Sequence, residues 1–185
     1  MQLNLFKRSA VTAGLAAMTL AVGSAQAYTF TLDVSGIFSN DELGSSINEM
    51  RFVDLLPGVQ IVGLAWDVAL FADAPSWLSE ISVALGDATD PNRLSLSPGV
   101  ASAVPGSESF SGSIDLVDQG LNFTLDATGR LNFQFYEIFD DFAADWDGIW
   151  ESGSITVTYV PEPASFGLAA LGLLGLAAVS RRRRA

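Results

Sequence analysis

The middle of the chain, residues 28–160, consists largely of short runs in which apolar and polar residues alternate. Alternation with a period of two is typical of a β-strand that buries one face and exposes the other to water. Every second residue is apolar from Tyr28 to Val34, and Ile155, Val157 and Tyr159 alternate with threonines. Further candidate strands are 62–70, 77–85, 110–117, 121–125 and 130–136. Because both faces of 62–70 are largely apolar, this strand is predicted to be central in its sheet.

Glycine and proline pairs separate these runs and predict turns. They are Pro57-Gly58, Pro91-Asn92, Pro98-Gly99, Pro105-Gly106 and Thr128-Gly129. Residues 125–131 are predicted to form a hairpin, and 40–56 fit either a short helix or a strand. Seven or eight strands without a long helix predict an all-β fold, an antiparallel β-sandwich that is jelly-roll-like.

The N-terminal segment has the pattern of a signal peptide, predicted as residues 1–27. Lys7 and Arg8 precede an apolar run, and Ala25-Gln26-Ala27 places small residues where signal peptidase requires them, so cleavage is expected after Ala27. The alternative is an uncleaved anchor, but the apolar run is shorter than the roughly 20 residues that span a bilayer.

The C-terminal segment, 161–185, has three parts. Pro161-Glu162-Pro163 comes first, an uncharged apolar stretch follows, and Arg181, Arg182, Arg183 and Arg184 nearly end the chain. A transmembrane helix is predicted at about 165–179, with the arginines as a cytoplasmic stop-transfer signal. The prolines are expected to form a stiff spacer between domain and membrane. An ordinary tail anchor is the alternative.

These three parts, in this order, resemble the PEP-CTERM sorting signal. The resemblance implies that Pro161, Glu162 and Pro163 are recognised by exosortase, an integral-membrane cysteine protease of Gram-negative bacteria that make extracellular polysaccharide. It also implies cleavage near the motif, which releases or transfers the domain.

The middle segment resembles a recurrent cargo domain of PEP-CTERM proteins that is similar to the β-sandwich P-domain beside proprotein convertases. The segments that carry this resemblance are Trp66-Asp67-Val68, 75–80, Phe135-Tyr136-Glu137, Phe139-Asp140-Asp141 and 153–159. In proprotein convertases this domain supports folding, so the resemblance implies no activity.

The strong negative charge of the middle segment argues against one class of function, the binding of nucleic acids. Three arginines against 20 acidic residues leave residues 28–160 with a net charge of about −17. Such a surface repels phosphate backbones, so nucleic-acid binding is not expected.

Residue types that carry most catalysis are missing. The chain has no cysteine and no histidine, and its one lysine, Lys7, lies in the predicted signal peptide. Thiolate, imidazole and lysine chemistry are therefore absent from the domain. Because Asp and Glu can carry out glycoside hydrolysis without other catalytic residue types, a glycosidase or lyase that uses carboxylates is the enzyme class left open. The protein is predicted not to be an enzyme.

Two ligand hypotheses remain open. Glu137, Asp140, Asp141, Asp145 and Asp147 form an acidic cluster that is either a solvated loop or a calcium site. Trp77, Trp146 and Trp150 flank turns and are candidates to stack on sugar rings, whereas Trp66 is expected in the core.

The sequence as a whole predicts an exported, non-catalytic envelope or matrix protein that needs no cofactor. Signal peptidase, exosortase and the inner membrane are its expected partners before maturation, and exopolysaccharide is a further candidate. The expected destination is the outer surface or extracellular matrix of a Gram-negative bacterium. The alternative is a module that binds exopolysaccharide with or without calcium.

Overall fold

The computed structural model describes residues 26–141 and 146–161, and these form ten β-strands and no helix. The strands are β1 (Tyr28–Asp33), β2 (Ile37–Ser39), β3 (Met50–Asp54), β4 (Gln60–Ala72), β5 (Ile81–Gly86), β6 (Leu94–Leu96), β7 (Gly106–Asp115), β8 (Phe123–Thr124), β9 (Arg130–Glu137) and β10 (Gly148–Val160). The all-β prediction is therefore confirmed.

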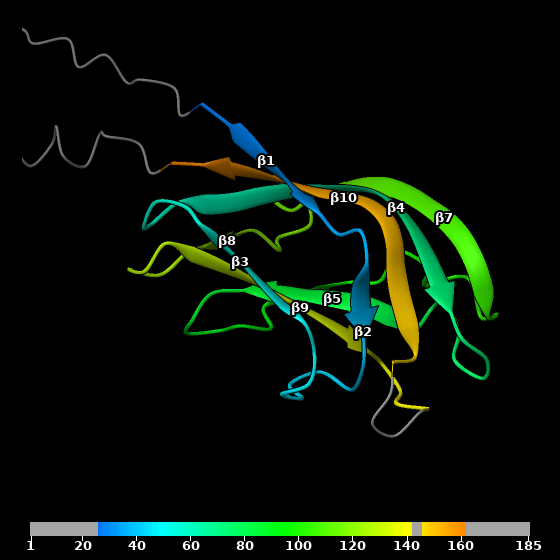
Figure 1. The fold of residues 1–185 in the computed structure, drawn as a ribbon. Helices are drawn as coiled ribbons and strands as arrows, with labels where there is room; N and C mark the ends of the chain where they lie inside the picture. Colours follow the sequence, from blue (N-terminus) through cyan, green and yellow to red (C-terminus); the bar gives the residue numbers. More distant parts are fainter. Residues whose placement is uncertain (1–25, 142–145, 162–185) are drawn as a thin grey trace, which may run out of the picture. The chain divides into compact units, whose positions relative to one another are not determined.

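The strands form two antiparallel sheets (Figure 1). The first has the order β1-β10-β4-β7, with β2 also pairing with β10 and β8 with β4, and the second has the order β3-β9-β5-β6. The pairs β1·β10, β3·β9, β4·β7 and β5·β6 are nested: the first strand pairs with the last, and each later pair lies inside the one before. The chain thus doubles back on itself as one long antiparallel ribbon.

The inward faces of the two sheets share one hydrophobic core. Phe30 in the first sheet meets Phe133 in the second edge to face, with ring centroids 6.3 Å apart. Trp150 meets Phe135 in the same way at 5.3 Å. Such contacts between aromatic rings add about 0.5–1.5 kcal/mol each to the free energy gained by burial.

The central position predicted for 62–70 is confirmed, since β4 pairs with both β10 and β7. Leu64, Val68 and Leu70 are buried as expected, and Trp66 packs half-buried against the core. The register shifts where Thr158 pairs with Gly63 and Tyr159 pairs with Ile61, so Val62 has no partner on β10. At this point Ile61 is buried, and not Val62 as the alternation predicts. A bulge of this kind switches which residues face inward.

One local prediction is wrong, and another that left two alternatives open is decided by the structure. The 125–131 hairpin is wrong, because β8 pairs with β4 in the first sheet and β9 pairs with strands of the second. The turn itself exists, with the Gly129 N–H donating to the Asp126 carbonyl at 3.1 Å, but it links the sheets. For 40–56 the strand alternative is confirmed, because a loop is followed by β3 at Met50–Asp54, and the helix alternative is wrong.

No helix that could span a membrane is found among the described residues. The predicted signal peptide and C-terminal helix lie outside these residues apart from Gln26 and Ala27, and so do Glu162, Pro163 and the four terminal arginines. They stay predictions from the sequence.

Candidate functional site

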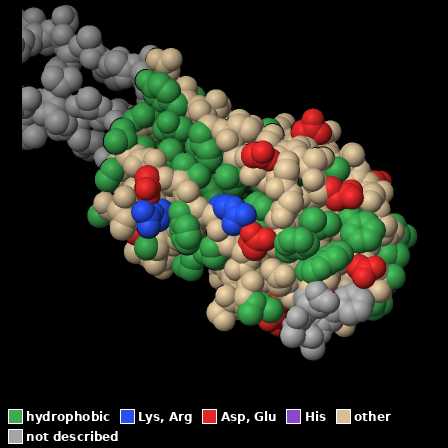
Figure 2. Space-filling model, in the orientation of Figure 1, with side chains coloured by type: hydrophobic (Ala, Val, Ile, Leu, Met, Phe, Trp, Pro, Cys, Tyr) green, Lys and Arg blue, Asp and Glu red, His purple; other side chains and the backbone are tan. Residues whose placement is uncertain are grey.

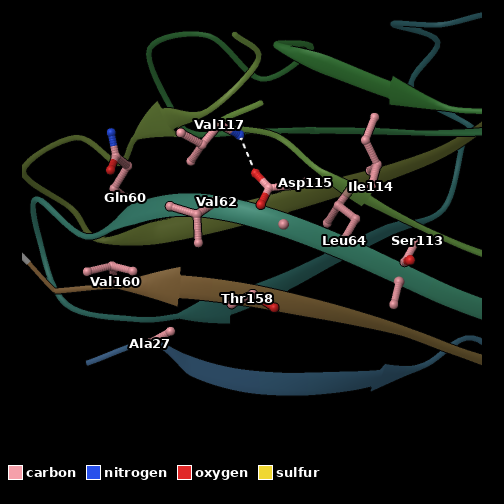
Figure 3. A pocket seen from close by; sticks show the side chains of 12 residues that line it. Ala27, Gln60, Val62, Leu64, Ser113, Ile114, Asp115, Val117, Thr158 and Val160 are labelled. Atoms are coloured by element: carbon pink, nitrogen blue, oxygen red, sulfur yellow. Dashed lines mark hydrogen bonds between the residues drawn. The ribbon is translucent and has the colours of Figure 1, made fainter. Parts of the chain in front are cut away.

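A shallow hollow of about 670 Å³ lies on the outward face of the first sheet, and we name it the β4 trough (Figure 3). Gly63 and Ala65 of β4 contribute its smallest side chains, with Thr158 on β10 and Ser113 and Asp115 on β7 beside them. Its other lining residues are Ala27, Gln60, Val62, Leu64, Ile114, Val117 and Val160. The hollow exists because glycine and alanine stand between longer neighbours on both sides.

Two rows of residues cross the face around the trough, and their hydroxyl side chains come from β1, β10 and β7. One row runs Thr29, Thr158, Gly63, Asp115, and the next runs Thr31, Thr156, Ala65, Ser113. The Thr31 and Thr156 hydroxyls are hydrogen-bonded at 2.9 Å. Hydroxyls both donate and accept, so this face can exchange hydrogen bonds with a ligand that does the same.

An aromatic cluster lies further along the same face. Trp146 packs half-buried against Phe38 of β2 and Phe71 of β4, with ring centroids 5.6 and 6.2 Å away. Phe71 lies eight residues along β4 from Gly63, a distance of about 26 Å at the rise of a strand. The trough and the aromatic cluster are therefore two ends of one face.

The three tryptophans proposed for ligand stacking differ in how exposed their rings are. Trp77, in the loop before β5, is 46% exposed, and Trp146 belongs to the aromatic cluster. Trp150 is 0% exposed and packs on Phe135, so its ring is not accessible to a ligand. Its assignment to a ligand surface is corrected: β10 begins at Gly148, and Trp150 faces inward from it.

A second site lies between the two sheets at the end of β9, where the charges of three other acidic side chains act on Glu137. This acid cluster consists of Glu80, Glu137, Asp141 and Asp147. Glu137 is the last residue of β9 and faces inward like Leu131, Phe133 and Phe135, with 0% exposure. Neither of its carboxyl oxygens has a hydrogen-bond partner among the described residues.

The surroundings of Glu137 strongly disfavour a negative charge. Burial, followed by the charges of Asp147, Glu80 and Asp141, raises its pKa to about 9. Its carboxyl group fills the space above Gly148, where an added Cβ would lie 2.6 Å from Oε1. Glycine at 148 is what leaves room for the carboxyl group.

The other three acids are anchored by backbone or side-chain donors. Asp147, 0% exposed, accepts from the Asp141 N–H through Oδ2 at 2.9 Å. Glu80 accepts from the Trp77 N–H at 2.8 Å, and Asp141 accepts from the Ser76 hydroxyl at 3.1 Å. No group of three or more acidic side chains within 26–141 and 146–161 is arranged to hold a metal ion.

The acidic loop predicted from the sequence is thus only partly gathered. Glu137, Asp141 and Asp147 come together, Asp140 is exposed, and Asp145 lies outside the described residues. The sequence did not predict Glu80 as part of this cluster, because it is far from the acidic loop along the chain. It comes close to Glu137 because β5, which begins directly after it, pairs with β9. Whether calcium binds stays a prediction.

The two ends of the described domain lie side by side. Tyr28 is paired with Tyr159, and their rings stack with centroids 5.9 Å apart. β10 continues to Val160, so no residue separates the strand from Pro161. Pro161 lines a hollow of about 390 Å³ together with Tyr28, Asp54, Leu55, Leu56 and Tyr159.

The described surface is mainly acidic and neutral. Figure 2 shows acidic side chains spread over the face in view and few basic ones. Arg51, Arg93 and Arg130 each form an ion pair, with Glu49, Asp90 and Asp54. Since water and salt screen these exposed or half-exposed pairs, each contributes little to stability.

Comparison with known proteins supports the sorting signal. A family model of the PEP-CTERM protein-sorting motif matches residues 160–184. No curated protein matches the chain. A crystal structure of the infectious bursal disease virus VP2 subviral particle is similar with 14% identity and a TM-score of 0.29, over 72% of this chain and 33% of the viral chain. This chain thus spans about a third of VP2.

The resemblance of the domain to the P-domain is not confirmed by these comparisons. The matched motif implies an exported, membrane-anchored precursor that exosortase processes. Residues 160–184 identify the chain as a protein that carries a PEP-CTERM protein-sorting motif.

Proposed function

We propose that this chain is a non-catalytic protein of the cell envelope or extracellular matrix, exported and then released from its membrane anchor by exosortase at the PEP-CTERM motif. The observation that carries the proposal is the motif match at 160–184. The absence of histidine and cysteine from the sequence supports a role without catalysis, because the commonest general base and the thiol nucleophile are missing.

The fold suits a domain that works at the end of a sorting tail. We infer from the nested pairing that the domain is a jelly-roll β-sandwich, in which the first and last long strands are neighbours. Both processing sites then flank one paired edge, Tyr28 beside Tyr159, and cleavage at either site removes no residue of the two sheets. A folded domain thus keeps its core through both cleavages.

Deleting exosortase from the native host tests this function. The protein is expected to remain in the inner-membrane fraction of the deletion strain, while in wild-type cells it reaches the outer surface or the medium. Fractionation followed by immunoblotting measures this, and restoring the exosortase gene is the control. Identical distribution in both strains would refute processing by exosortase.

The second candidate function is binding of a neutral polysaccharide on the outward face of the first sheet. The observation that favours it is the β4 trough with its hydroxyl rows and the aromatic cluster on the same face. Hydroxyls of a sugar chain match the rows, and a pyranose face packs on exposed aromatic carbon. The acidic surface disfavours an anionic polymer.

Filling the trough separates this candidate from the first. Tyrosine is well accepted on an exposed strand face, so Ala65→Tyr is expected to fold normally while blocking the trough. Affinity electrophoresis in gels containing exopolysaccharide from the native host should show the wild-type chain retarded and the variant about tenfold less so, a loss of about 1.4 kcal/mol. Val100→Tyr, at a loop residue that is 74% exposed, is the matched control. Equal retardation of the Ala65 variant and wild type would contradict the assignment.

A further inference from the structure

The buried carboxyl group of Glu137 destabilises the fold unless something else binds it. Both of its oxygens are hidden from solvent and have no hydrogen-bond partner among the described residues. Leaving one buried polar group unsatisfied costs about 1–3 kcal/mol, and more when it is charged. A group in this condition calls for a bound water, an ion or a functional reason.

A second unsatisfied oxygen lies on the strand opposite. The Ser39 hydroxyl, at the end of β2, is fully buried and has no partner among the described residues. Ser39 is the register partner of Gly148, and Gly148 is the residue whose open side is filled by Glu137 Oε1. Ile37 and Ser39 are both buried on β2 while Phe38 between them is half-exposed, so Ser39 faces inward on the same side as Glu137.

The carboxyl group of Asp147 belongs to the same place. Asp147 directly precedes Gly148, is 0% exposed, and is the charge that acts most strongly on Glu137. Its backbone is fixed on both sides, since its N–H donates to Ser39 O at 3.1 Å and its carbonyl accepts from Asp73 N–H at 2.9 Å. The end of β2, the end of β9 and the start of β10 lie close together at one end of the domain (Figure 1). The register of Ser39 with Gly148, the approach of Glu137 to Gly148 and the effect of the Asp147 charge on Glu137 place these three side chains around one buried point.

We propose that this point binds a divalent cation of the calcium type, with Glu137, Asp147 and Ser39 as its protein ligands. Calcium takes six to eight oxygen ligands from carboxylates, hydroxyls, carbonyls and water, and a carboxylate contributes one or two. Two carboxylates and one hydroxyl form a partial sphere that water completes. Such a site needs no third acidic ligand, so it is compatible with the absence of a three-acid group in the described residues.

A cation explains these residues better than a buried water does. Water can satisfy a hydroxyl, but it leaves Glu137 protonated beside the other acidic side chains, whereas a bound cation allows Glu137 and Asp147 to be ionised together. Glu80 and Asp141 add negative charge around the same point. Their carboxylates are kept in position by the hydrogen bonds that they accept from the Trp77 N–H and the Ser76 hydroxyl. The bound cation would join the ends of β2 and β9 to the loop that precedes β10.

Thermal unfolding of the full-length chain in mild detergent tests the site. After treatment with a chelator, 10 mM CaCl₂ is expected to raise the Tm of the wild-type chain by about 5–10 °C, the effect of a site with Kd near 0.1–1 mM. Glu137→Gln keeps the size of the side chain and removes its charge, so its Tm should not respond. Asp140→Asn removes an exposed charge from the adjacent loop and should respond as the wild type does.

Calorimetric titration with CaCl₂ gives a readout that does not depend on stability. The wild-type chain and Asp140→Asn should both release or absorb heat with saturation, and Glu137→Gln should not. No calcium effect on the wild-type chain in either measurement would overturn the proposal. An equal calcium effect on wild type and Glu137→Gln would overturn it too, because the ion would then bind elsewhere.

Discussion

Glu137→Gln is expected to stabilise the cation-free protein by on the order of 3 kcal/mol at pH 7, the opposite of what most buried substitutions do. The folded-state pKa of Glu137 is about 9 and the ordinary value is 4.5. Between these two values the folded protein holds a proton that the unfolded chain gives up. Stability therefore falls as the pH rises through this window, by about 1.4 kcal/mol per pH unit. Glutamine is neutral throughout and removes this slope.

Urea unfolding in the presence of a chelator, from pH 4 to 9, measures the effect. The two proteins should be about equally stable below pH 4.5, and the curves should separate steadily above it. Glu151→Gln, which removes an exposed carboxylate from β10, is the control and should follow the wild type. A Glu137→Gln variant that is less stable than wild type at pH 7, or that keeps the same slope, would mean that Glu137 is ionised and well solvated in the fold.

Replacing Pro161, Glu162 and Pro163 together with alanine is expected to stop maturation. Pro161 directly follows β10, so the motif begins where the domain ends. Three alanines remove the fixed proline backbone and the carboxylate while leaving the length of the tail unchanged. In the native host the rate of conversion should fall about tenfold or more, equivalent to about 1.4 kcal/mol in recognition.

Pulse labelling followed by electrophoresis measures this conversion. Pro105→Ala is the matched control, because it removes a proline that directly precedes β7, and β7 begins beside Ala72, at the opposite end of β4 from the strand residue that pairs with Val160. The control should mature at the wild-type rate. Normal maturation of the triple-alanine variant would show that the three residues are only a linker before a tail anchor.

The sequence predicted best those strands in which an uninterrupted alternation of apolar and polar residues determines which side chains are buried. Ile155, Val157 and their threonine neighbours alternate without interruption, and β10 follows that alternation with the apolar residues inward. The alternation predicted that Val62 is buried, but Ile61 is buried instead. This difference could not be predicted from the pattern, because it depends on a bulge in the pairing with β10. The false hairpin has a similar cause: a local turn signal gives the reversal of the chain but not the sheet to which the next strand adds.

The candidate sites depend more heavily on distant contacts. Gly63 and Ala65 can be noticed in the sequence, since they are small residues in a strand of larger ones. That they form a hollow becomes clear only when Thr158 and Ser113 are seen to line it on the neighbouring strands. Glu137 was singled out as part of an acidic loop, yet its inward direction follows from the alternation of β9. Trp150 was misplaced because the start of β10 could not be located from turn signals alone.

The intact mass of the mature protein purified from its native host reports both cleavages in one measurement. The expected mass is that of a chain that begins at Tyr28, after cleavage behind Ala27, and ends near the Pro161-Glu162-Pro163 motif, without the apolar tail and the four arginines. A mass equal to that of a chain extending to Ala185 would contradict it.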